Sequence, residues 1–230
     1  MLGDNADIAV LMPVLNEAAR IGRRLDELSV LGLTEIVVCD GGSTDATADI
    51  AAARSGVQLV CQRGGRGAQL QAAFRKTAAP VVLMLHADTQ LPDDAVALMR
   101  IALADPGVAG GCFRLSFDRK GAALALYGWL TRFETTFTSF GDQAFFARRA
   151  AIDAGGGIPD WPLFEDVELR RRLRRQGRFV KLAASVATSA RRFERSGVIR
   201  GQVLNILFVC GFWLGLSPRW LAARYRSEEH

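Results

Sequence analysis

The chain has 230 residues, a mass of 25.0 kDa and a formal net charge of +5, and half of its residues are hydrophobic. This size fits one domain with a sizeable core, and the composition excludes a largely disordered chain. The charge is uneven, because residues 165–230 carry 14 Lys/Arg against six Asp/Glu. Such a basic region can meet a phosphate, an anionic membrane or nucleic acid, although a solvated helix surface is its commonest cause.

The cysteines and the N-terminus indicate the compartment. Cys39, Cys61, Cys112 and Cys210 show no CxxC spacing, and they are expected to be buried free thiols in a reducing cytosol. The N-terminal MLGDNAD is acidic and leads straight into a strand, so no signal peptide is expected. These features predict a cytoplasmic protein.

From residue 8 the sequence alternates buried-strand patterns with helical patterns. Strands are expected at 8–14, 35–40, 57–61 and 80–85, and helices at 16–31, 44–54, 67–78 and 92–104. This serial order predicts an α/β fold with a mostly parallel central sheet and helices on both faces.

After residue 105 the pattern loosens. We expect a strand over 107–117, an amphipathic helix over 121–137, a strand and short helix over 141–152, a helix over 164–177, extended segments over 178–190 and an apolar helix or helix pair over 196–217. Residues 1–195 are therefore predicted to form the main domain, and 196–230 a basic and apolar helical tail.

The longest apolar run, over 203–217, is shorter than the ~20 residues that a membrane-spanning helix needs. Arginines flank this run on both sides. It therefore suits either a helix packed on the core or an interfacial element at the inner face of a membrane.

Polar or glycine-rich groups follow four successive predicted strands. They are Pro13 to Glu17, Asp40 to Asp45, Arg63 to Gly67 and His86 to Gln90. Ligands of open α/β sheets bind beyond the carboxyl ends of the strands, so these turns are expected to converge on one site. Each turn taken singly also suits the start of a helix, where capping groups are needed.

The turn from Arg63 to Gly67 reads RGGRG and precedes a helix. Its backbone N–H groups and two guanidinium groups favour an anion at the helix N-terminus. The turn lacks the GK[ST] of a Walker A motif, and no GxGxxG follows the first strand. ATPase and NAD-binding functions therefore lose support.

Two acidic motifs are candidates for chemistry. His86, Asp88 and Gln90 alternate along an extended turn, so together with substrate phosphates they could hold one divalent ion, Mg²⁺ or Mn²⁺. Glu165 and Asp166 open a helix, where acids complement the helix dipole and where a carboxylate facing a pocket is also a general base. Local features do not separate these two interpretations of the acidic pair.

Six stretches together, in this order, form a pattern that is specific for one family, although each alone is weak: IAVLMPVLNEA, EIVVCDGGSTDAT, GRGAQLQAAF, VVLMLHADTQLP, GDQAFFARR and GGIPDWPLFEDVELRRRLRRQG. In this order the chain resembles the family 2 glycosyltransferases of GT-A fold over about residues 8 to 182. The HADT variant is similar to a bacterial subgroup of radical-SAM/selenodomain-associated transferases. The resemblance implies a GT-A fold with a C-terminal helical tail.

The resemblance also implies roles for single residues on the donor side. Pro13, Glu17 and Asp40 match positions that grip the nucleotide base and ribose, and Arg66 and Gly67 match the basic turn beside the nucleotide. Arg63 belongs to the same turn and is expected to help offset the charge of the leaving diphosphate.

The remaining matches concern the metal and the reaction. Asp88 matches the final Asp of the DxD motif, which meets the metal and the diphosphate, and Asp166 matches the general base of inverting members. His86 departs from the family, which usually has Asp there, and imidazole suits Mn²⁺ better than Mg²⁺. Gln90 is a further candidate ligand.

Four residues are expected on the acceptor side. They are Asp142 and Gln143, which precede a predicted strand, Trp161, which offers a stacking surface for a sugar ring, and Glu165. An acceptor that is linked to a lipid would fit the apolar run at 203–217.

The sequence therefore predicts a metal-assisted inverting glycosyltransferase that moves a sugar from a UDP- or GDP-sugar to an acceptor hydroxyl. A nucleotidyltransferase is an alternative, but its signature loop would be expected where this chain has PVLNEA. A catalytically silent nucleotide- or glycan-binding module is a second alternative. Nucleic acid is not expected as a partner, because aromatic residues are not interleaved with the arginines.

Overall fold

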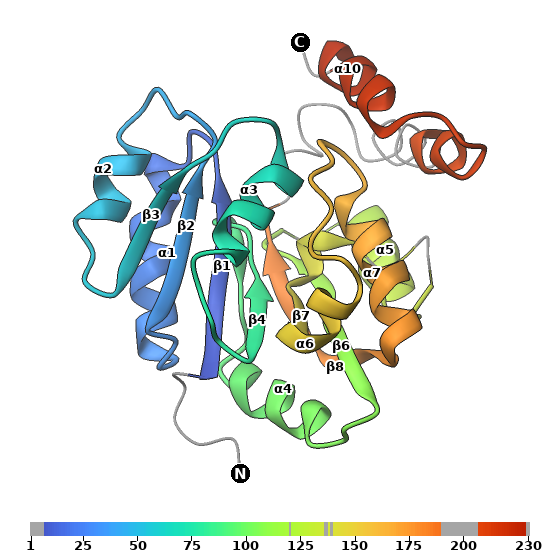
Figure 1. Cartoon of the computed structure of the whole chain (residues 1–230), viewed down its shortest axis with the longest axis horizontal. Coiled ribbons are helices and arrows are strands. Elements are labelled where there is room, and N and C mark those ends of the chain that lie inside the picture. Colours follow the sequence, from blue (N-terminus) through green and yellow to red (C-terminus); the bar gives the residue numbers. More distant parts are fainter. Residues whose placement is uncertain (1–6, 120, 136–137, 139, 190–206, 229–230) are drawn as a thin grey trace.

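The structure, a computed structural model, describes residues 7–119, 121–135, 138, 140–189 and 207–228. Its strands are β1 (Ile8–Val14), β2 (Glu35–Asp40), β3 (Val57–Cys61), β4 (Val81–Met84), β5 (Thr89–Gln90), β6 (Val108–Phe117), β7 (Phe145–Arg148) and β8 (Arg178–Thr188). They form one sheet in the order β3-β2-β1-β4-β7-β6-β8-β5 (Figure 1).

The sheet is parallel in its first half and mixed in its second. Strands β3, β2, β1 and β4 pair in parallel, as the serial strand–helix pattern predicts. Strand β7 then runs antiparallel to both β4 and β6, while β6 and β8 are parallel to each other. The carboxyl ends of β1, β2, β3 and β4 therefore meet at one edge, where the predicted turns follow them.

The helices cover both faces of this sheet, which confirms the predicted α/β architecture. They are α1 (Ala18–Val30), α2 (Thr47–Ala52), α3 (Arg66–Phe74), α4 (Ala95–Leu103), α5 (Ala122–Leu130), the 3₁₀ turn η2 (Gly141–Gln143), α6 (Arg149–Ala154), α7 (Glu165–Gln176) and α10 (Pro218–Glu228). Residues 207–213 are also helical.

Two apolar cores lie on opposite faces of the sheet, because successive side chains of a strand point to opposite sides. In β1, Val10 and Met12 belong to the core that includes residues of α1 and α4, and Leu11 belongs to the core that includes residues of α3 and α7. All seven residues of β1 are buried. A strand covered on both faces reads as one continuous apolar run, which is why β1 was predictable.

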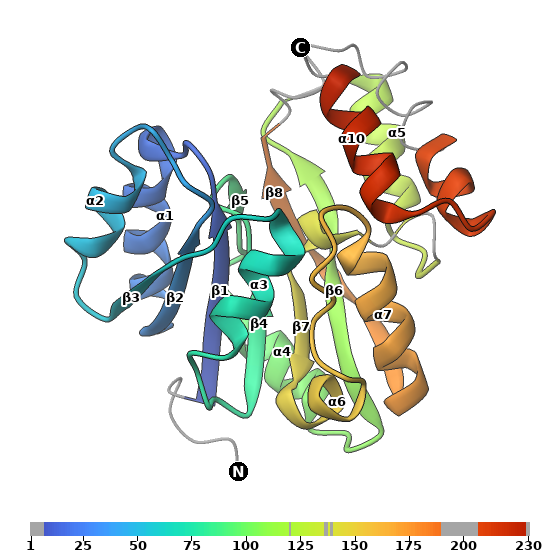
Figure 2. The same ribbon diagram turned by 45° about the horizontal axis from the view of Figure 1, so that its top comes forward.

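The described part of the tail packs on the domain at the start of α7. Val209 and Leu221 form a small apolar cluster with Phe164 and Val167, and the ring of Phe212 lies 5.1 Å from that of Phe164. Figures 1 and 2 show the red helices at the edge of the molecule, on the side away from β1, β2 and β3. Within the described ranges, no helix has both the length and the apolar character needed to cross a bilayer.

The cysteines correct one prediction. Cys39 and Cys112 are buried as expected, but Cys61 and Cys210 are exposed, and all four are free thiols. Cys61 ends the edge strand β3, which only β2 covers in the sheet order. The apolar neighbours of these two residues did not indicate this exposure.

Candidate active site

Three of the predicted motifs meet at Arg66, the first residue of α3. Its guanidinium group forms an ion pair with Glu165 and lies 3.4 Å from Oδ2 of Asp166. The same group lies 3.4 Å from Nε2 of His86, at the end of β4. The turns after β3 and β4 thus converge, as the strand-end argument predicts, and the start of α7 joins them.

Two adjoining cavities surround this convergence. The smaller is lined by Pro13, Arg66, Leu70, Met84, Leu85, His86, Gly141, Phe145, Glu165, Asp166 and Leu169. The larger, of about 200 Å³, is lined by Pro13, Val14, Leu15, Glu17, Arg66, Gln69, His86, Ala87 and Asp88. Pro13, Arg66 and His86 line both cavities, so the acidic pair of α7 and the ends of β1 and β4 face one cleft.

Asp166 is 7 % exposed and is held in place by several donors. Its Oδ2 accepts a hydrogen bond of 2.6 Å from the backbone N–H of Gly141, and its Oδ1 accepts one from the N–H of Val167. These two donors and the nearby Arg66 fix the position of the carboxylate group. A fixed carboxylate that borders a cavity has the placement of a proton acceptor.

Glu165 is 1 % exposed, and burial raises its pKa, while the charge of Arg66 acts in the opposite direction. Its Oε1 pairs with Arg66, and its buried Oε2 has no hydrogen-bond partner among the described residues. Burial also opposes the charge of Arg66, but Glu165 and Asp166 outweigh burial and hold its pKa above the ordinary value. Arg66 therefore stays a cation beside both carboxylates.

The turn after β2 is held together by hydrogen bonds to Asp40. This buried carboxylate accepts hydrogen bonds of 2.9 Å from the N–H groups of Gly42 and Ser43, and another from the Ser43 hydroxyl. Arg63 is exposed and lies over this turn, because a Cβ on Gly42 would meet its Nε at 2.7 Å. Asp40 and Arg63 are thus neighbours, and Asp40 has a structural role in addition to its predicted nucleotide contact.

Gly67 has a packing role that its match to the nucleotide turn did not indicate. A Cβ at this position would lie 2.3 Å from the carbonyl oxygen of Pro159 and 2.4 Å from that of Trp161. The Gly67 N–H donates to the Trp161 carbonyl at 3.2 Å. The start of α3 therefore packs directly on the backbone of the loop that precedes Glu165.

Gln69 was missed by the sequence reasoning. Its side-chain amide donates to the carbonyl oxygens of Val14 and Cys39, at 2.9 and 2.7 Å, and it lines the larger cavity. These carbonyl groups belong to the ends of β1 and β2, so Gln69 ties the two strand ends together. A glutamine within an apolar helical stretch was the available signal.

The predicted metal ligands are brought together only in part. His86 and Asp88 line the larger cavity, whereas Gln90 is exposed and shares with Asp88 a separate cavity of about 440 Å³. Within the described residues, no three His, Cys, Asp or Glu side chains form a cluster that could hold an ion. His86 and Asp88 fit an ion that takes its remaining ligands from substrate phosphates.

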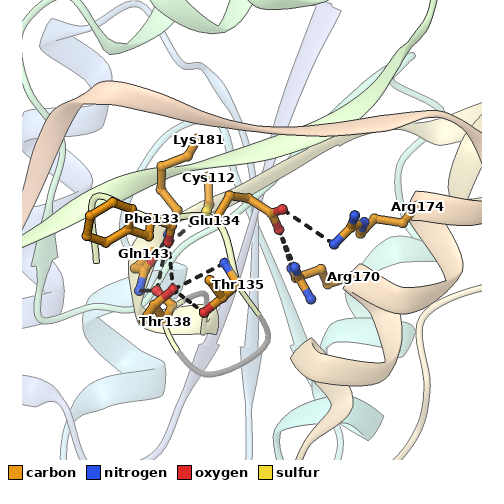
Figure 3. Close-up of polar contacts among 9 residues, drawn as sticks. All are labelled: Cys112, Phe133, Glu134, Thr135, Thr138, Gln143, Arg170, Arg174 and Lys181. Atoms are coloured by element: carbon orange, nitrogen blue, oxygen red, sulfur yellow. Dashed lines mark hydrogen bonds and ion pairs between the residues drawn. The ribbon is translucent and has the colours of Figure 1, made fainter. Parts of the chain in front are cut away.

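Gln143 corrects a prediction on the acceptor side. It is fully buried, and Figure 3 shows that its side chain lies against Thr138 and Lys181. Its Nε2 donates to the Thr138 carbonyl at 2.7 Å, and its Oε1 accepts a hydrogen bond from Nζ of Lys181. A side chain with no exposed surface does not contact an acceptor, so Gln143 is an internal link.

The other acceptor-side residues lie at different depths. Asp142 is half-buried beside Gly141, and its charge raises the pKa of Arg66 in addition to the stronger effects of Glu165 and Asp166. Trp161 lines neither of the two cleft cavities, and its ring meets that of Phe212 edge-on at 5.9 Å. The predicted stacking surface for a sugar is thus turned towards the tail.

Solved structures share this fold. The chain matches glucosyl-3-phosphoglycerate synthase from Mycobacterium tuberculosis, solved with Mn²⁺, UDP and glucosyl-3-phosphoglycerate, with a TM-score of 0.61 at 24 % identity, over 89 % of this chain and 80 % of that one. It matches mannosyltransferase PcManGT from Pyrobaculum calidifontis, solved with GDP-Man and Mn²⁺, with a TM-score of 0.65 at 20 % identity, over 96 % of this chain and 74 % of that one. The fold is that of the GT-A glycosyltransferases.

The sequence comparison is more specific. The model of glycosyl transferase family 2 matches residues 9–153, which is more than half of the chain, so the protein belongs to this family. Glycosyltransferase AglJ of Haloferax volcanii is 36 % identical over 83 residues, which are 35 % of this chain and 27 % of AglJ. This family membership argues against the alternative of a nucleotidyltransferase.

Proposed function

We propose that the protein transfers a sugar from a UDP- or GDP-sugar to an acceptor hydroxyl with inversion at the anomeric carbon. The observation that carries the proposal is the placement of Asp166, which borders the same cleft as Arg66 and His86. The family membership supports sugar transfer, and the two solved structures described above were determined with UDP and with GDP-Man.

In this proposal the nucleotide lies at the ends of β1 and β2, against Pro13, Glu17 and Asp40. Its diphosphate lies beside Arg66, whose charge offsets the negative charge that grows on the leaving group. Glu165 holds Arg66 in place through the buried ion pair. The donor is thus bound at the strand ends, and its anomeric carbon faces α7.

The chemical step then needs one base. Asp166 takes the proton of the acceptor hydroxyl while the hydroxyl oxygen forms a bond to the anomeric carbon. The bond from that carbon to the diphosphate oxygen breaks, and the nucleoside diphosphate leaves with the electron pair. Attack from the face opposite the leaving group inverts the configuration.

A divalent cation, Mn²⁺ or Mg²⁺, is part of the proposal. Asp88 and His86 would hold it together with the donor diphosphate, and when bound it neutralises phosphate charge. Two protein ligands give a weak site by themselves, so we expect the ion to bind with the donor rather than before it. Gln90 would need to move to join them.

The acceptor in this proposal is linked to a lipid, and the protein works on the cytoplasmic side of a membrane. Asp166 follows Phe164 by two residues, and the Phe164 ring packs on Phe212 of the tail. The apolar tail thus lies close to the proposed base. Of the predicted membrane segment 203–217, residues 203–206 lie outside the described residues, and the boundary between domain and tail at 195 and 196 does as well.

A thermal-shift screen tests the donor part of the proposal. The protein is melted with UDP, GDP, CDP or TDP, each with Mn²⁺, Mg²⁺ or EDTA. We expect one nucleotide to stabilise it in a metal-dependent way, and Asp88→Ala to abolish the shift while the exposed Asp93→Ala keeps it. Binding that does not need a metal would contradict the role of Asp88.

The donor identified in this way tests the chemistry. The anomeric configuration of the transferred sugar, read by NMR, is expected to be opposite to that of the donor. Asp166→Asn should bind the nucleotide normally and lose transfer by about 100-fold or more, the usual size of a general-base effect. The exposed Asp153→Asn is the matched control. Transfer that survives in Asp166→Asn would exclude this residue as the base.

A further inference from the structure

Large apolar side chains are exposed mainly in two segments of the described chain. Of the twelve such residues, nine fall within 126–133 and 207–220: Leu126, Trp129, Leu130, Phe133, Leu207, Trp213, Leu214, Leu216 and Trp220. Both segments lie on the side of the molecule away from β1, β2 and β3 (Figures 1 and 2). Single exposed apolar residues are ordinary, but a concentration of this kind indicates an interaction surface.

Helix α5 contributes the first segment. Its inner face is fixed on the sheet, because Leu124 is buried and the Thr131 hydroxyl accepts a hydrogen bond of 2.9 Å from the N–H of Leu115. Its outer face carries Leu126 and Trp129, which are about half exposed. The sequence predicted an amphipathic helix here, but the solvent side is apolar as well.

The C-terminal helices contribute the second segment. Val209 and Leu221 face the domain, whereas Trp213, Leu214 and Trp220 point outwards. Leu214 is 86 % exposed and lies in the turn between the two helices. One side of the two C-terminal helices thus packs on the domain, and the other side exposes apolar side chains to solvent.

The charges around these segments identify the partner. The tail sequence over 207–227 has Arg219, Arg224 and Arg226 and no acidic residue. The guanidinium group of Arg224 lies 4.6 Å from the centre of the Trp220 ring, and that of Arg132 lies 5.5 Å from the Trp129 ring. Tryptophan, leucine and arginine together suit the interface of an anionic lipid bilayer.

We propose that the outer face of α5 and the outer side of the C-terminal helices bind the surface of an anionic lipid bilayer. A second copy of this chain fits less well, because its arginines would face these arginines. The inference goes beyond the proposed reaction, since lipid binding needs neither donor nor Asp166. It explains how a lipid-linked acceptor would be presented beside Phe164, which contacts Phe212.

Vesicle sedimentation tests this proposal on the full chain. We expect binding to vesicles of phosphatidylcholine with phosphatidylglycerol, weaker binding at high salt, and little binding to phosphatidylcholine alone. The variant Trp213→Ser/Leu214→Ser/Trp220→Ser should bind about tenfold more weakly or worse. The control is Val30→Ser/Ile101→Ser, which changes residues that are 87 % and 71 % exposed elsewhere.

Further measurements make the outcome decisive. Brominated lipids should quench the fluorescence of the unmodified protein, because three of its four tryptophans lie in the two segments. Leu126→Ser/Trp129→Ser should also weaken binding, and full binding by this variant would overturn the part played by α5. Absence of vesicle binding together with a concentration-dependent dimer would overturn the proposal in favour of a second copy.

The nucleotide thermal shift is expected to be the same in all variants. A loss of lipid binding is therefore distinct from a failure of the proposed reaction.

Discussion

Arg66 and Glu165 form an ion pair across 99 positions of the sequence, and it joins the turn after β3 to the first residue of α7. Glu165 is 1 % exposed, whereas the Arg66 side chain keeps 33 % of its surface exposed. A buried pair is weak evidence for stability as a whole, but removal of one partner leaves an uncompensated charge. The ion pair therefore links the turn after β3 to the start of α7, so that a change in one is expected to affect the position of the other.

Arg66→Ala tests this dependence. It leaves both Glu165 and Asp166 without their cation, so we expect a loss of about 2 kcal/mol in the free energy of unfolding, less than for a fully buried pair because Arg66 is partly exposed. Denaturant unfolding measures the loss. Arg63→Ala, an exposed arginine of the same turn, is expected to change stability by less than about 0.5 kcal/mol. Equal effects of both variants would contradict the role of the pair.

The raised pKa of Glu165 predicts a pH dependence of stability. Burial is the main cause, so in the window between its ordinary pKa and the raised value the folded state holds a proton that the unfolded state has released. The stability contributed by this group is therefore full below the ordinary pKa and falls as the pH rises through the window. Glu165→Gln removes this component. The free energy of unfolding of the wild type, minus that of Glu165→Gln, should therefore decrease as the pH rises through this window. A difference that stays constant with pH would contradict the prediction.

The convergence of strand ends was predictable from the sequence, and the side-chain orientations were not. Four buried strand patterns followed by polar turns predict that Arg66 and His86 lie at one edge. The place of Asp166 beside them was implied by the family resemblance alone. The direction of Trp161 depends on Phe212, which is 51 positions later and belongs to another element. Contacts of this kind leave no local pattern in the sequence.

Gln143 is a polar residue whose orientation likewise could not be predicted from its neighbours in the sequence. A glutamine before a strand suggests a surface, but here the half-buried Lys181 of β8 is the partner of its carbonyl oxygen. The family resemblance implies that Asp40 contacts the nucleotide, and in the structure both of its carboxylate oxygens accept hydrogen bonds within its own turn. A polar side chain in a βα turn can serve the turn or a ligand, and its type alone does not separate the two.

Gly67→Ala should be destabilising because of backbone contact. The added Cβ would lie within 2.7 Å of three backbone atoms of Pro159 and Trp161, so the loop before α7 must move. Overpacking of this kind costs about 1–3 kcal/mol, and we expect the melting temperature to fall by several degrees. Gly121→Ala is the control, because its Cβ would meet its nearest neighbour at 3.7 Å, an ordinary contact. An unchanged melting temperature for Gly67→Ala would show that the loop adapts freely.

The cysteines should fall into two classes of reactivity. Burial raises the pKa of Cys39 to about 12, and Cys112 is buried as well, whereas Cys61 and Cys210 are exposed. The thiolate is the reactive form, so two of the four thiols should react quickly with an aromatic disulfide reagent at mildly alkaline pH, and the other two only on unfolding. Cys61→Ser and Cys210→Ser should each remove one fast equivalent. Four fast thiols in the native protein would contradict the burial of Cys39 and Cys112.

The network in Figure 3 leads to a prediction about catalysis. Lys181 donates to Gln143 and, at 3.1 Å, to the Thr138 carbonyl, so it fixes the segment that ends at η2. Gly141, the first residue of η2, donates its N–H to Asp166. Gln143→Leu removes one of the two acceptors of Lys181 and one donor to Thr138, which should cost about 1–3 kcal/mol in stability.

The same change should loosen the hydrogen bond that fixes Asp166. We therefore expect Gln143→Leu to lower kcat by about tenfold, since a small displacement of a base is costly, and to leave the nucleotide thermal shift unchanged. Lys181→Met should act in the same direction. The exposed Lys76→Met is its control and should keep full activity. If Gln143→Leu lost stability but kept the wild-type kcat, the network would hold the fold without positioning Asp166, because Gly141 would then stay in place without it.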